Sequence, residues 1–336
     1  MVTHPLLRIG TRGSPLALAQ ANEVRGRLAA IDPDLARTGA VEVVIIRTTG
    51  DRVQDRTLVE LGGKGLFTKE IEEALIGGAI DLAVHSMKDM PTELPPGLII
   101  GALLPREDPR DAFLSLTAAT LDDLPAGAVV GTASLRRQAQ LLAARPDLVV
   151  VPVRGNVQTR LERLREGRMD ATLLAMAGLN RLKLTEVARS PIDPSVMLPA
   201  VAQGAIGIEC RAADDRTAGW VRALNDPETA VAVEAERGLL AVLDGSCRTP
   251  IAALAVRSVA PGRDAQAMTL TARVASPDGT TVLEDSLTHV VGQGDTAAAL
   301  ALGRHVGQAL RDRAGDDIAR WAAGVTGQWV PGSGPA

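Results

Sequence analysis

Two short stretches of the sequence carry side chains that could do chemistry. Asp89 lies in the stretch HSMKDMP (85–91), directly after an apolar run, where a carboxylate can transfer protons or stabilise a cation. A simpler alternative is that Asp89 pairs with Lys88 or caps a turn. Cys247 lies in the stretch DGSCRTP (244–250), where the neighbouring Arg248 favours the nucleophilic thiolate. A structural role for Cys247 is equally consistent with this pattern.

Positive charge is concentrated in one part of the chain. Residues 134–168 include eight arginines and three acidic residues, whereas the whole chain has 36 basic and 40 acidic residues. Arg136 and Arg137 follow a predicted strand-to-helix turn, and Arg154 ends a predicted strand, which places them at the ligand-binding edge of an open α/β sheet. Together with Arg160 they favour an anionic ligand with several charges. The other arginines of this segment, expected on the solvated surface, are Arg145, Arg163, Arg165 and Arg168.

The composition argues against several classes of protein. The 336 residues have a net charge of −4 and include no Tyr, two Phe and three Trp, so a basic or base-stacking nucleic-acid binder is not expected. Two cysteines and four widely spaced histidines give neither a disulfide framework nor metal-ligand spacing. We see no signal-peptide pattern, and no stretch approaches the roughly 18 apolar residues of a membrane span. We therefore expect a cytoplasmic protein without a metal, nucleic-acid or membrane partner.

The elements that must position these side chains alternate between strands and helices. Apolar runs predict strands at 6–10, 41–46, 82–85, 98–104, 128–131, 148–153, 171–175 and 206–210. Helices are predicted to begin near residues 14, 68, 134, 156, 227 and 296. The first begins at Ser14-Pro15, where Ser serves as N-cap and Pro occupies the first turn. Charged or proline-containing joints at 105–111 and 190–194 interrupt the alternation.

This order predicts an α/β protein of two doubly wound lobes around a cleft, an architecture like that of periplasmic binding proteins, with a smaller α+β domain at the C-terminal end. Alternation on either side of Pro277-Asp278-Gly279 indicates a hairpin in that last domain. The expected boundaries are 1–104 for the first lobe, 110–198 for the second lobe, 227–327 for the C-terminal domain and 328–336 for a disordered tail.

Several longer motifs together resemble the porphobilinogen deaminase (hydroxymethylbilane synthase) family. Between about Leu7 and Pro250 they occur in the order TRGSPLAL (11–18), GGKGLF (62–67), VHSMKD (84–89), GTASLRR (131–137), RGNV (154–157), LPAVAQGA (198–205) and GSC (245–247). The sequence departs from the commonest family pattern, without losing a reacting group, at Ser246, at Arg248-Thr249, and at Asn180 and Lys183 around Arg181.

The resemblance implies a specific reaction. Family members join four porphobilinogen molecules head to tail with loss of ammonia, on a dipyrromethane primer attached to a cysteine by a thioether, and then hydrolyse the product off as hydroxymethylbilane. Cys247 matches the cysteine that carries this cofactor. Asp89 matches the catalytic aspartate, whose carboxylate would hold pyrrole N–H groups and stabilise the azafulvene cation formed as ammonia leaves.

The resemblance also gives the arginines a role, because each pyrrole brings an acetate and a propionate, and buried carboxylates need partners. The residues implied for carboxylate binding are Arg12, Ser14, Lys88, Ser134, Arg136, Arg137, Arg154, Arg160 and Arg181. Those implied for the lid and the cleft are Lys64, in a lid at about 48–65, and Ser86, Gln203 and Gly204. The segment order of the family further implies that residues 205–222 complete the first lobe and that the chain is a monomer.

Two other functions fit parts of the pattern. A non-catalytic anion-binding protein could share the two-lobed architecture, because fold alone does not define function. Such a binder has no use for a thiol at Cys247 opposite Asp89. A phosphate-processing enzyme would need metal-binding carboxylates and a stronger phosphate loop than the glycine-rich segment around Lys64, which lacks the Lys-Ser/Thr ending.

Overall fold

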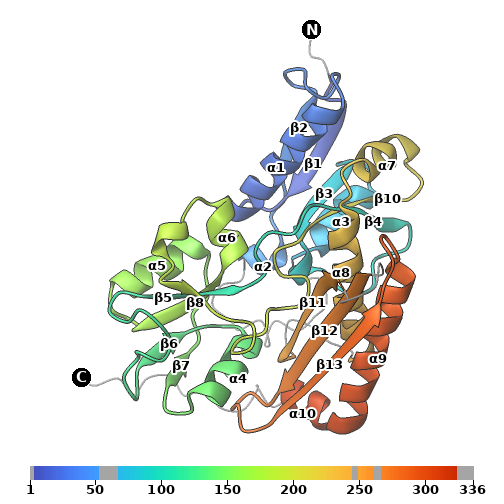
Figure 1. Ribbon diagram of the computed structural model, residues 1–336. Helices are drawn as coiled ribbons and strands as arrows, with labels where there is room; N and C mark the ends of the chain where they lie inside the picture. The colour runs from blue at the N-terminus through green and yellow to red at the C-terminus, as the bar shows by residue number, and fades with distance from the viewer. Residues whose placement is uncertain (1–3, 53–66, 244–248, 260–265, 324–336) are drawn as a thin grey trace.

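The computed structural model describes residues 4–52, 67–243, 249–259 and 266–323. These residues form three units, each built on its own sheet, which we call lobe 1, lobe 2 and the C-terminal unit (Figure 1). Two of the sheets are mixed and have five strands, and the third is antiparallel and has three. The predicted fold class, two α/β lobes and a smaller α+β part, is confirmed.

Lobe 1 is a sheet with helices on both faces. Its strands are, in spatial order, β2 (Val41–Ile45), β1 (Leu7–Thr11), β3 (Leu82–Ser86), β10 (Ile206–Arg211) and β4 (Leu98–Leu103). The helices are α1 (Pro15–Ile31) and α7 (Asp215–Arg222) on one face and α3 (Lys69–Ile76) on the other, with the short α2 (Thr49–Arg52) beyond β2. Val24 of α1 shares a buried cluster with Ile9 and Val84, whereas Ile71 of α3 shares one with Ala83. Adjacent residues of β3 thus face opposite helices, as strand geometry requires.

The predicted start of α1 is confirmed in detail. Ser14 is the N-cap and accepts a hydrogen bond from the Ala17 backbone N–H at 3.3 Å, while Pro15 occupies the first helical position. The Ser14 side chain thus binds a backbone N–H that has no partner within the helix, and Pro15 stands where its missing N–H costs no hydrogen bond. The helix therefore begins directly after the loop that follows β1, at the carboxyl edge of the lobe 1 sheet.

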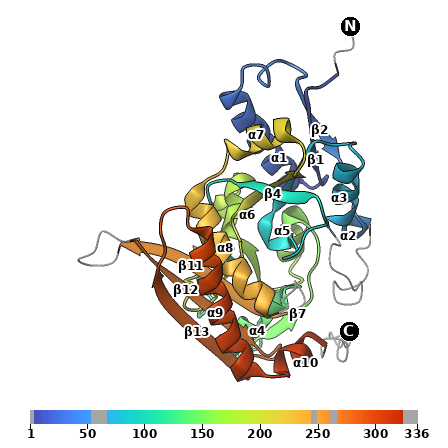
Figure 2. The same cartoon turned by 90° about the vertical axis from the view of Figure 1, so that its right-hand side faces the viewer.

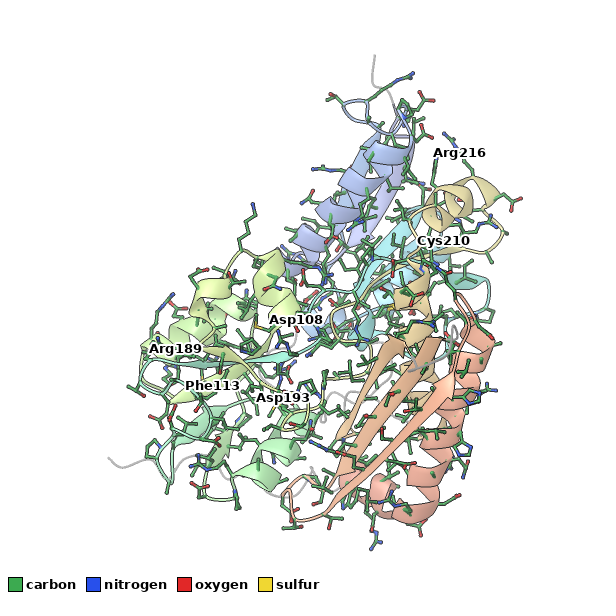
Figure 3. All side chains as sticks on the ribbon, in the orientation of Figure 1. Asp108, Phe113, Arg189, Asp193, Cys210 and Arg216 are labelled. Atoms are coloured by element: carbon green, nitrogen blue, oxygen red, sulfur yellow. The ribbon has the colours of Figure 1, made fainter. Side chains whose placement is uncertain are left out.

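Lobe 2 repeats the layered arrangement. Its strands are, in spatial order, β7 (Val149–Val151), β6 (Val129–Gly131), β8 (Ala171–Ala175), β5 (Asp111–Ser115) and β9 (Ser190–Pro191). Its helices are α4 (Leu135–Ala144) on one face and α5 (Val157–Arg165) and α6 (Met176–Arg181) on the other, with the 3-10 turn η2 (Thr185–Val187) leading to β9. Phe113, labelled in Figure 3, is fully buried in the α4 face.

The chain crosses twice between the lobes. After β4 it passes through residues 104–110 into lobe 2, and after β9 it returns through 192–205 to β10, which lies antiparallel between β3 and β4. Gly204 on the return has φ +92°, and a Cβ there would lie 2.3 Å from the Glu107 carbonyl oxygen of the other crossing. The two crossings therefore touch at a point where only glycine fits. Asp108, on the first crossing, lies where the lobes meet (Figure 3).

The C-terminal unit is a three-stranded antiparallel sheet covered by helices. Its elements are α8 (Pro227–Val242), β11 (Ile251–Val259), β12 (Gln266–Ala275), β13 (Val282–Val290), α9 (Thr296–Ala314) and α10 (Asp317–Ala323). Figure 2 shows α8 and α9 side by side along the sheet, and a Cβ at Gly303 of α9 would lie 2.0 Å from the Ala235 carbonyl oxygen of α8. The predicted hairpin is confirmed as β12 and β13.

The sequence analysis missed three strands, of which the short β9 lies within the joint predicted at 190–194. It placed Asp111 in a joint between the lobes, but Asp111 begins β5 and its side chain is buried. It also gave no strand before the hairpin, where β11 runs antiparallel to β12 over nine residue pairs. No helix within the described residues is long and apolar enough to cross a membrane.

Candidate functional site

Lys88 and Asp89 lie at the carboxyl end of β3, in the 3-10 turn η1 (Met87–Asp89). Both side chains are exposed, whereas Met87 and Met90 on either side are 2% and 4% exposed. The two methionines belong to a buried cluster that also contains Leu243 of the C-terminal unit. The Met87 backbone N–H donates to the Ala205 carbonyl at 3.0 Å, which fixes the turn to the returning crossing. Apolar anchors thus hold the turn while Lys88 and Asp89 face solvent.

Gln203 connects this turn to lobe 2. Its side chain is buried, and its Nε2 donates to Asp111 Oδ1 at 2.9 Å and to the Pro109 carbonyl at 2.7 Å. Its Oε1 accepts a hydrogen bond from Lys88 Nζ at 3.4 Å. Because Gln203 lies on one crossing and Pro109 on the other, one amide links both crossings, the η1 turn and β5.

Asp111 is the centre of a buried ion-pair cluster. Its Oδ2 lies 2.7 Å from Arg136 Nη1 and its Oδ1 lies 2.8 Å from Arg137 Nη2, and all three side chains are at most 7% exposed. The Leu198 and Leu173 carbonyls accept further hydrogen bonds from the two guanidinium groups. Burial alone would raise the pKa of Asp111, but the two arginines outweigh it and hold that pKa well below the usual range. One carboxylate therefore compensates two permanent positive charges.

The surroundings of this cluster remain strongly cationic. Burial, together with the charges of Arg137, Arg163 and Arg154, lowers the pKa of Arg160 to about 10. Burial of the Lys88 ammonium lowers its pKa to about 8; Asp89 and Asp111 oppose this shift, and Arg137 and Arg136 add to it. Desolvation of the ammonium is thus the main cause of this shift, and the charges of the two arginines add to it. An anion bound at Lys88 would stabilise its charged form.

Helix N-termini add to the field at this edge. Ser134 caps α4 and accepts from the Arg137 backbone N–H at 3.4 Å, and Asn156 caps α5 directly after Arg154 and Gly155. These positions follow β6 and β7, at the carboxyl edge of the lobe 2 sheet where α/β proteins bind ligands. The sequence analysis predicted this placement, and the structure puts Ser134, Arg136, Arg137, Arg154 and Arg160 at that edge.

Other predicted site residues have partners elsewhere in the lobes. Arg12 forms an ion pair with Asp51, and its guanidinium lies 4.2 Å from the centre of the Phe67 ring. Ser86 exchanges hydrogen bonds with Gln20 at 2.9 and 3.2 Å.

Arg181 joins the two lobes through contacts on both. Its side chain is 9% exposed and lies 3.4 Å from Glu23 of α1, and it also donates to the Gly204 carbonyl at 3.0 Å. Arg181 thus links lobe 2 to lobe 1 at the return crossing.

Two of the predicted residues, Cys247 and Lys64, lie outside the described residues. The other cysteine, Cys210, is fully buried in β10 (Figure 3). Burial raises the pKa of its thiol, which is typical of a structural cysteine. Among the described residues, no group of His, Cys, Asp and Glu side chains is arranged to hold a metal ion.

Sequence reasoning missed Asp111 and the pair Arg106–Glu236. Glu236 of α8 is fully buried, lies 2.6 Å from Arg106 on the first crossing, and accepts from the Ala202 backbone N–H at 2.6 Å. This pair ties the C-terminal unit to both crossings. The available signal was an acidic residue immediately before or within an apolar stretch, as at Asp111 before Ala112, because such a carboxylate must be paired if the stretch is buried.

Comparisons with known proteins agree along nearly the whole chain. Residues 7–219 match the family described as "Porphobilinogen deaminase, dipyromethane cofactor binding domain", and residues 230–312 match "Porphobilinogen deaminase, C-terminal domain". The chloroplastic porphobilinogen deaminase of Oryza sativa is 56% identical over 92% of this chain and 84% of its own length. The porphobilinogen deaminase of Paracoccus denitrificans is 53% identical over 94% of this chain and 97% of its own.

Among solved structures, the methionine binding protein MetQ covers 65% of this chain and 89% of its own, with 12% identity and a TM-score of 0.42. The identities to curated relatives are far higher and extend over both matched domains. The chain therefore belongs to the porphobilinogen deaminase family.

Proposed function

We propose that this chain joins four porphobilinogen molecules head to tail with loss of ammonia and releases the product as hydroxymethylbilane, as a transferase of tetrapyrrole synthesis. The observation that carries the proposal is the exposed Asp89 carboxylate beside Lys88, within the field of the Arg136–Arg137 cluster. This arrangement offers a negative charge for a cationic intermediate and positive charges for the carboxylates of the same substrate.

Asp89 would act on the pyrrole ring itself. Its carboxylate accepts hydrogen bonds from pyrrole N–H groups and stabilises the azafulvene cation that forms when the C–N bond breaks and ammonia leaves. Because Met87 and Met90 are anchored in the core, the backbone that carries Asp89 is held in place while its carboxylate stays exposed. Such positioning in advance is what makes electrostatic stabilisation effective.

The cationic edge would bind acetate and propionate groups. We assign Lys88 and Arg160 to direct contact, because among the described residues neither cation has an ion-pair partner: Lys88 donates to the Gln203 amide and Arg160 to the Gly155 carbonyl. Arg136 and Arg137 would supply the surrounding potential and one further contact each, since Asp111 already accepts hydrogen bonds from both. The remaining proposed contacts are Arg12, Ser14, Ser134, Arg154 and Arg181, with Ser86, Gln203 and Gly204 lining the junction between the lobes.

The same residues fit a covalent dipyrromethane cofactor. A dipyrromethane carries several carboxylates, and the positive charges of Arg137, Arg163 and Arg154 all act on Arg160. When bound, the cofactor supplies the pyrrole end on which the chain is extended. We assign its attachment to Cys247, which follows α8, and the closing of a lid over the site to Lys64. Leu243, at the end of α8, belongs to the same buried cluster as the methionines beside Asp89.

We further propose domain boundaries of 1–104 with 205–222 for lobe 1, 110–198 for lobe 2 and 227–327 for the C-terminal domain. The sheet order supports these limits, because β10 lies in the lobe 1 sheet. The proposed chain is a cytoplasmic monomer whose partner is porphobilinogen, without a nucleic-acid or membrane partner.

The test is the release of ammonia and the consumption of porphobilinogen by the wild type and the Asp89→Asn variant. Asn keeps the size of the side chain and removes its charge, so we expect a folded protein with turnover reduced by several orders of magnitude. Glu93→Gln, which removes an exposed carboxylate four residues away, serves as the matched control and should keep wild-type activity. If the wild type bound porphobilinogen without releasing ammonia, the chain would be an anion-binding protein and the proposal would fail.

A further inference from the structure

A second cluster of ionisable side chains lies inside lobe 1 and has no part in the function proposed above. It consists of His85 on β3, Glu209 on β10 and Glu72 on α3, which we call the buried triad. His85 Nε2 lies 3.0 Å from Glu209 Oε2, and the two side chains are 5% and 0% exposed. Glu72 is 8% exposed and lies on the helix that covers this side of the sheet, and the charges of Glu209 and His85 both act on its carboxyl group.

Two carboxylate oxygens of the buried triad lack a hydrogen-bond partner among the described residues. Within the described residues, Glu72 Oε1 and Glu209 Oε1 are both buried and have no hydrogen-bond partner. Two ionised carboxylates cannot donate to each other, and their charges repel in a medium that solvates them poorly. A proton on one of them removes the repulsion and creates an O–H donor for the other.

Among the described residues, His85 is the one group whose positive charge would favour ionised Glu72. Thr68, directly before α3, and Glu73 of α3 also influence its charge. Arg211 of β10 is turned to the far end of the helix, where its Nη1 donates to the Leu75 and Ile80 carbonyls. Burial therefore raises the pKa of Glu72, and the charge of Glu209 raises it further, against the opposite effects of Thr68 and His85.

We propose that Glu72 is held as a neutral acid in the folded protein, donates its O–H to Glu209, and through His85 helps to position Lys88 and Asp89. The proposal involves no covalent change; Glu72 keeps its proton and shares it with Glu209 in a hydrogen bond. Glu209 then accepts from Glu72 on one oxygen and from His85 Nε2–H on the other. The positioning part rests on the function proposed above, whereas the protonation part does not.

The strand register explains how the triad would act on the site. His85 lies opposite Gly207 and Glu209 lies opposite Ala83, so the His85–Glu209 contact is a diagonal bridge between β3 and β10. β3 leads within three residues to Lys88, and β10 begins two residues after Gly204. The triad thus ties together the two strands that enter the site and the helix behind them.

The proposal predicts a specific pH dependence of stability. The folded protein retains a proton on Glu72 at pH values where the unfolded chain, with a carboxyl pKa near 4.5, has released it. The contribution of Glu72 to stability must therefore fall as the pH rises above 4.5, until the folded form also loses the proton. Glu72→Gln keeps an N–H donor for Glu209 and removes the titration, so this variant should lack that fall.

The experiment measures denaturant unfolding of the cofactor-loaded wild type, Glu72→Gln and Glu73→Gln between pH 4.5 and 8. Glu73 is the adjacent residue of the same helix and its side chain is 63% exposed, which makes it the matched control. The unfolding constant of the wild type should rise relative to that of Glu72→Gln by up to about tenfold per pH unit, and that of Glu73→Gln should follow the wild type. If the ratio of the unfolding constant of the wild type to that of Glu72→Gln did not change with pH, the proposal would be overturned.

Two further measurements keep the proposal testable if Glu72→Gln folds poorly. Infrared spectra of wild type with 13C-labelled glutamate should show the carbonyl band of a protonated carboxyl group that persists to higher pH than the bands of the exposed glutamates, and its absence would reject the neutral acid. For positioning, Glu72→Met, which has no donor, should lower kcat with little change in KM, while Glu72→Gln should lose any alkaline decline in kcat. If kcat and its pH dependence were unchanged in both variants, the positioning role of Glu72 would be rejected. A wild type without turnover would reject the proposed function alone.

Discussion

The buried cluster around Asp111 allows a quantitative prediction for Asp111→Asn. The substitution keeps the shape of the side chain but leaves Arg136 and Arg137 without a counter-charge, in a place where all three side chains are at most 7% exposed. Removing one partner of a buried ion pair costs about 3–5 kcal/mol, because the charge left behind is poorly solvated. Against a typical total stability of roughly 5–15 kcal/mol, such a loss should be large.

The assay is urea denaturation of cofactor-loaded protein at pH 7, with Asp147→Asn as the control. Asp147 also pairs with an arginine, Arg145, at 2.6 Å, but the pair is on the surface. We expect the control to unfold close to the wild type and Asp111→Asn to unfold at a much lower urea concentration. A double variant with Arg137→Gln should be less destabilised than the sum of the single effects, because the two residues interact directly.

The pKa of Asp111 also predicts how the stability difference between the wild type and Asp111→Asn changes with pH. The pKa of Asp111 in the folded protein lies below the 3.8 of an ordinary aspartate, so its stabilising contribution is complete above pH 3.8 and is lost as the pH falls below it. The stability difference between the wild type and Asp111→Asn should therefore be constant at neutral pH and shrink on acidification. If Asp111→Asn stayed within about 1 kcal/mol of the wild type at pH 7, the reasoning about the buried cluster would be refuted.

Three other substitutions test separate parts of the account. Gly204→Ala should destabilise the protein by at least about 1–3 kcal/mol in urea unfolding, because φ is +92° and the new Cβ would meet the Glu107 carbonyl. A smaller effect would mean that the two crossings move apart easily. Arg160→Gln should raise KM for porphobilinogen roughly tenfold or more through a lost charged hydrogen bond, while the exposed Arg168→Gln should not, and equal KM values would remove Arg160 from the site. Porphobilinogen binding should weaken as the pH rises through about 8 and the free Lys88 loses its proton; a pH dependence retained in Lys88→Met would assign it to another group.

Much of the fold was predictable because local signals agreed with the tertiary structure. The predicted strand at 171–175 coincides with β8, and the Ser14-Pro15 signal begins α1 at its observed first residue. Both are cases in which apolar pattern and capping chemistry act within a few residues. β5 was missed because its first residue is a buried aspartate after a charged, proline-containing run, which by itself is typical of a loop.

The residue types and the location of the site were predictable, but the partners of its side chains were not. The positions of Arg136, Arg137 and Arg154 after strands placed them at the correct sheet edge. Their partners could not be predicted in the same way, because Asp111 is 25 residues before Arg136 and Gln203 is 92 residues after Asp111. Local composition carries no information about such long-range contacts, so arginines that all looked available for a ligand proved to differ in how far the protein already neutralises them.

The central claim is that the chain builds its product on a covalent dipyrromethane, and the mass of the intact protein tests it most directly. The wild type and Cys247→Ala would be purified in parallel and measured before and after addition of porphobilinogen. The account predicts an excess equal to two linked pyrrole units on the wild type, further increments when substrate is added, and the bare polypeptide mass for the variant. A folded wild type that keeps the bare mass even after porphobilinogen is added would contradict it.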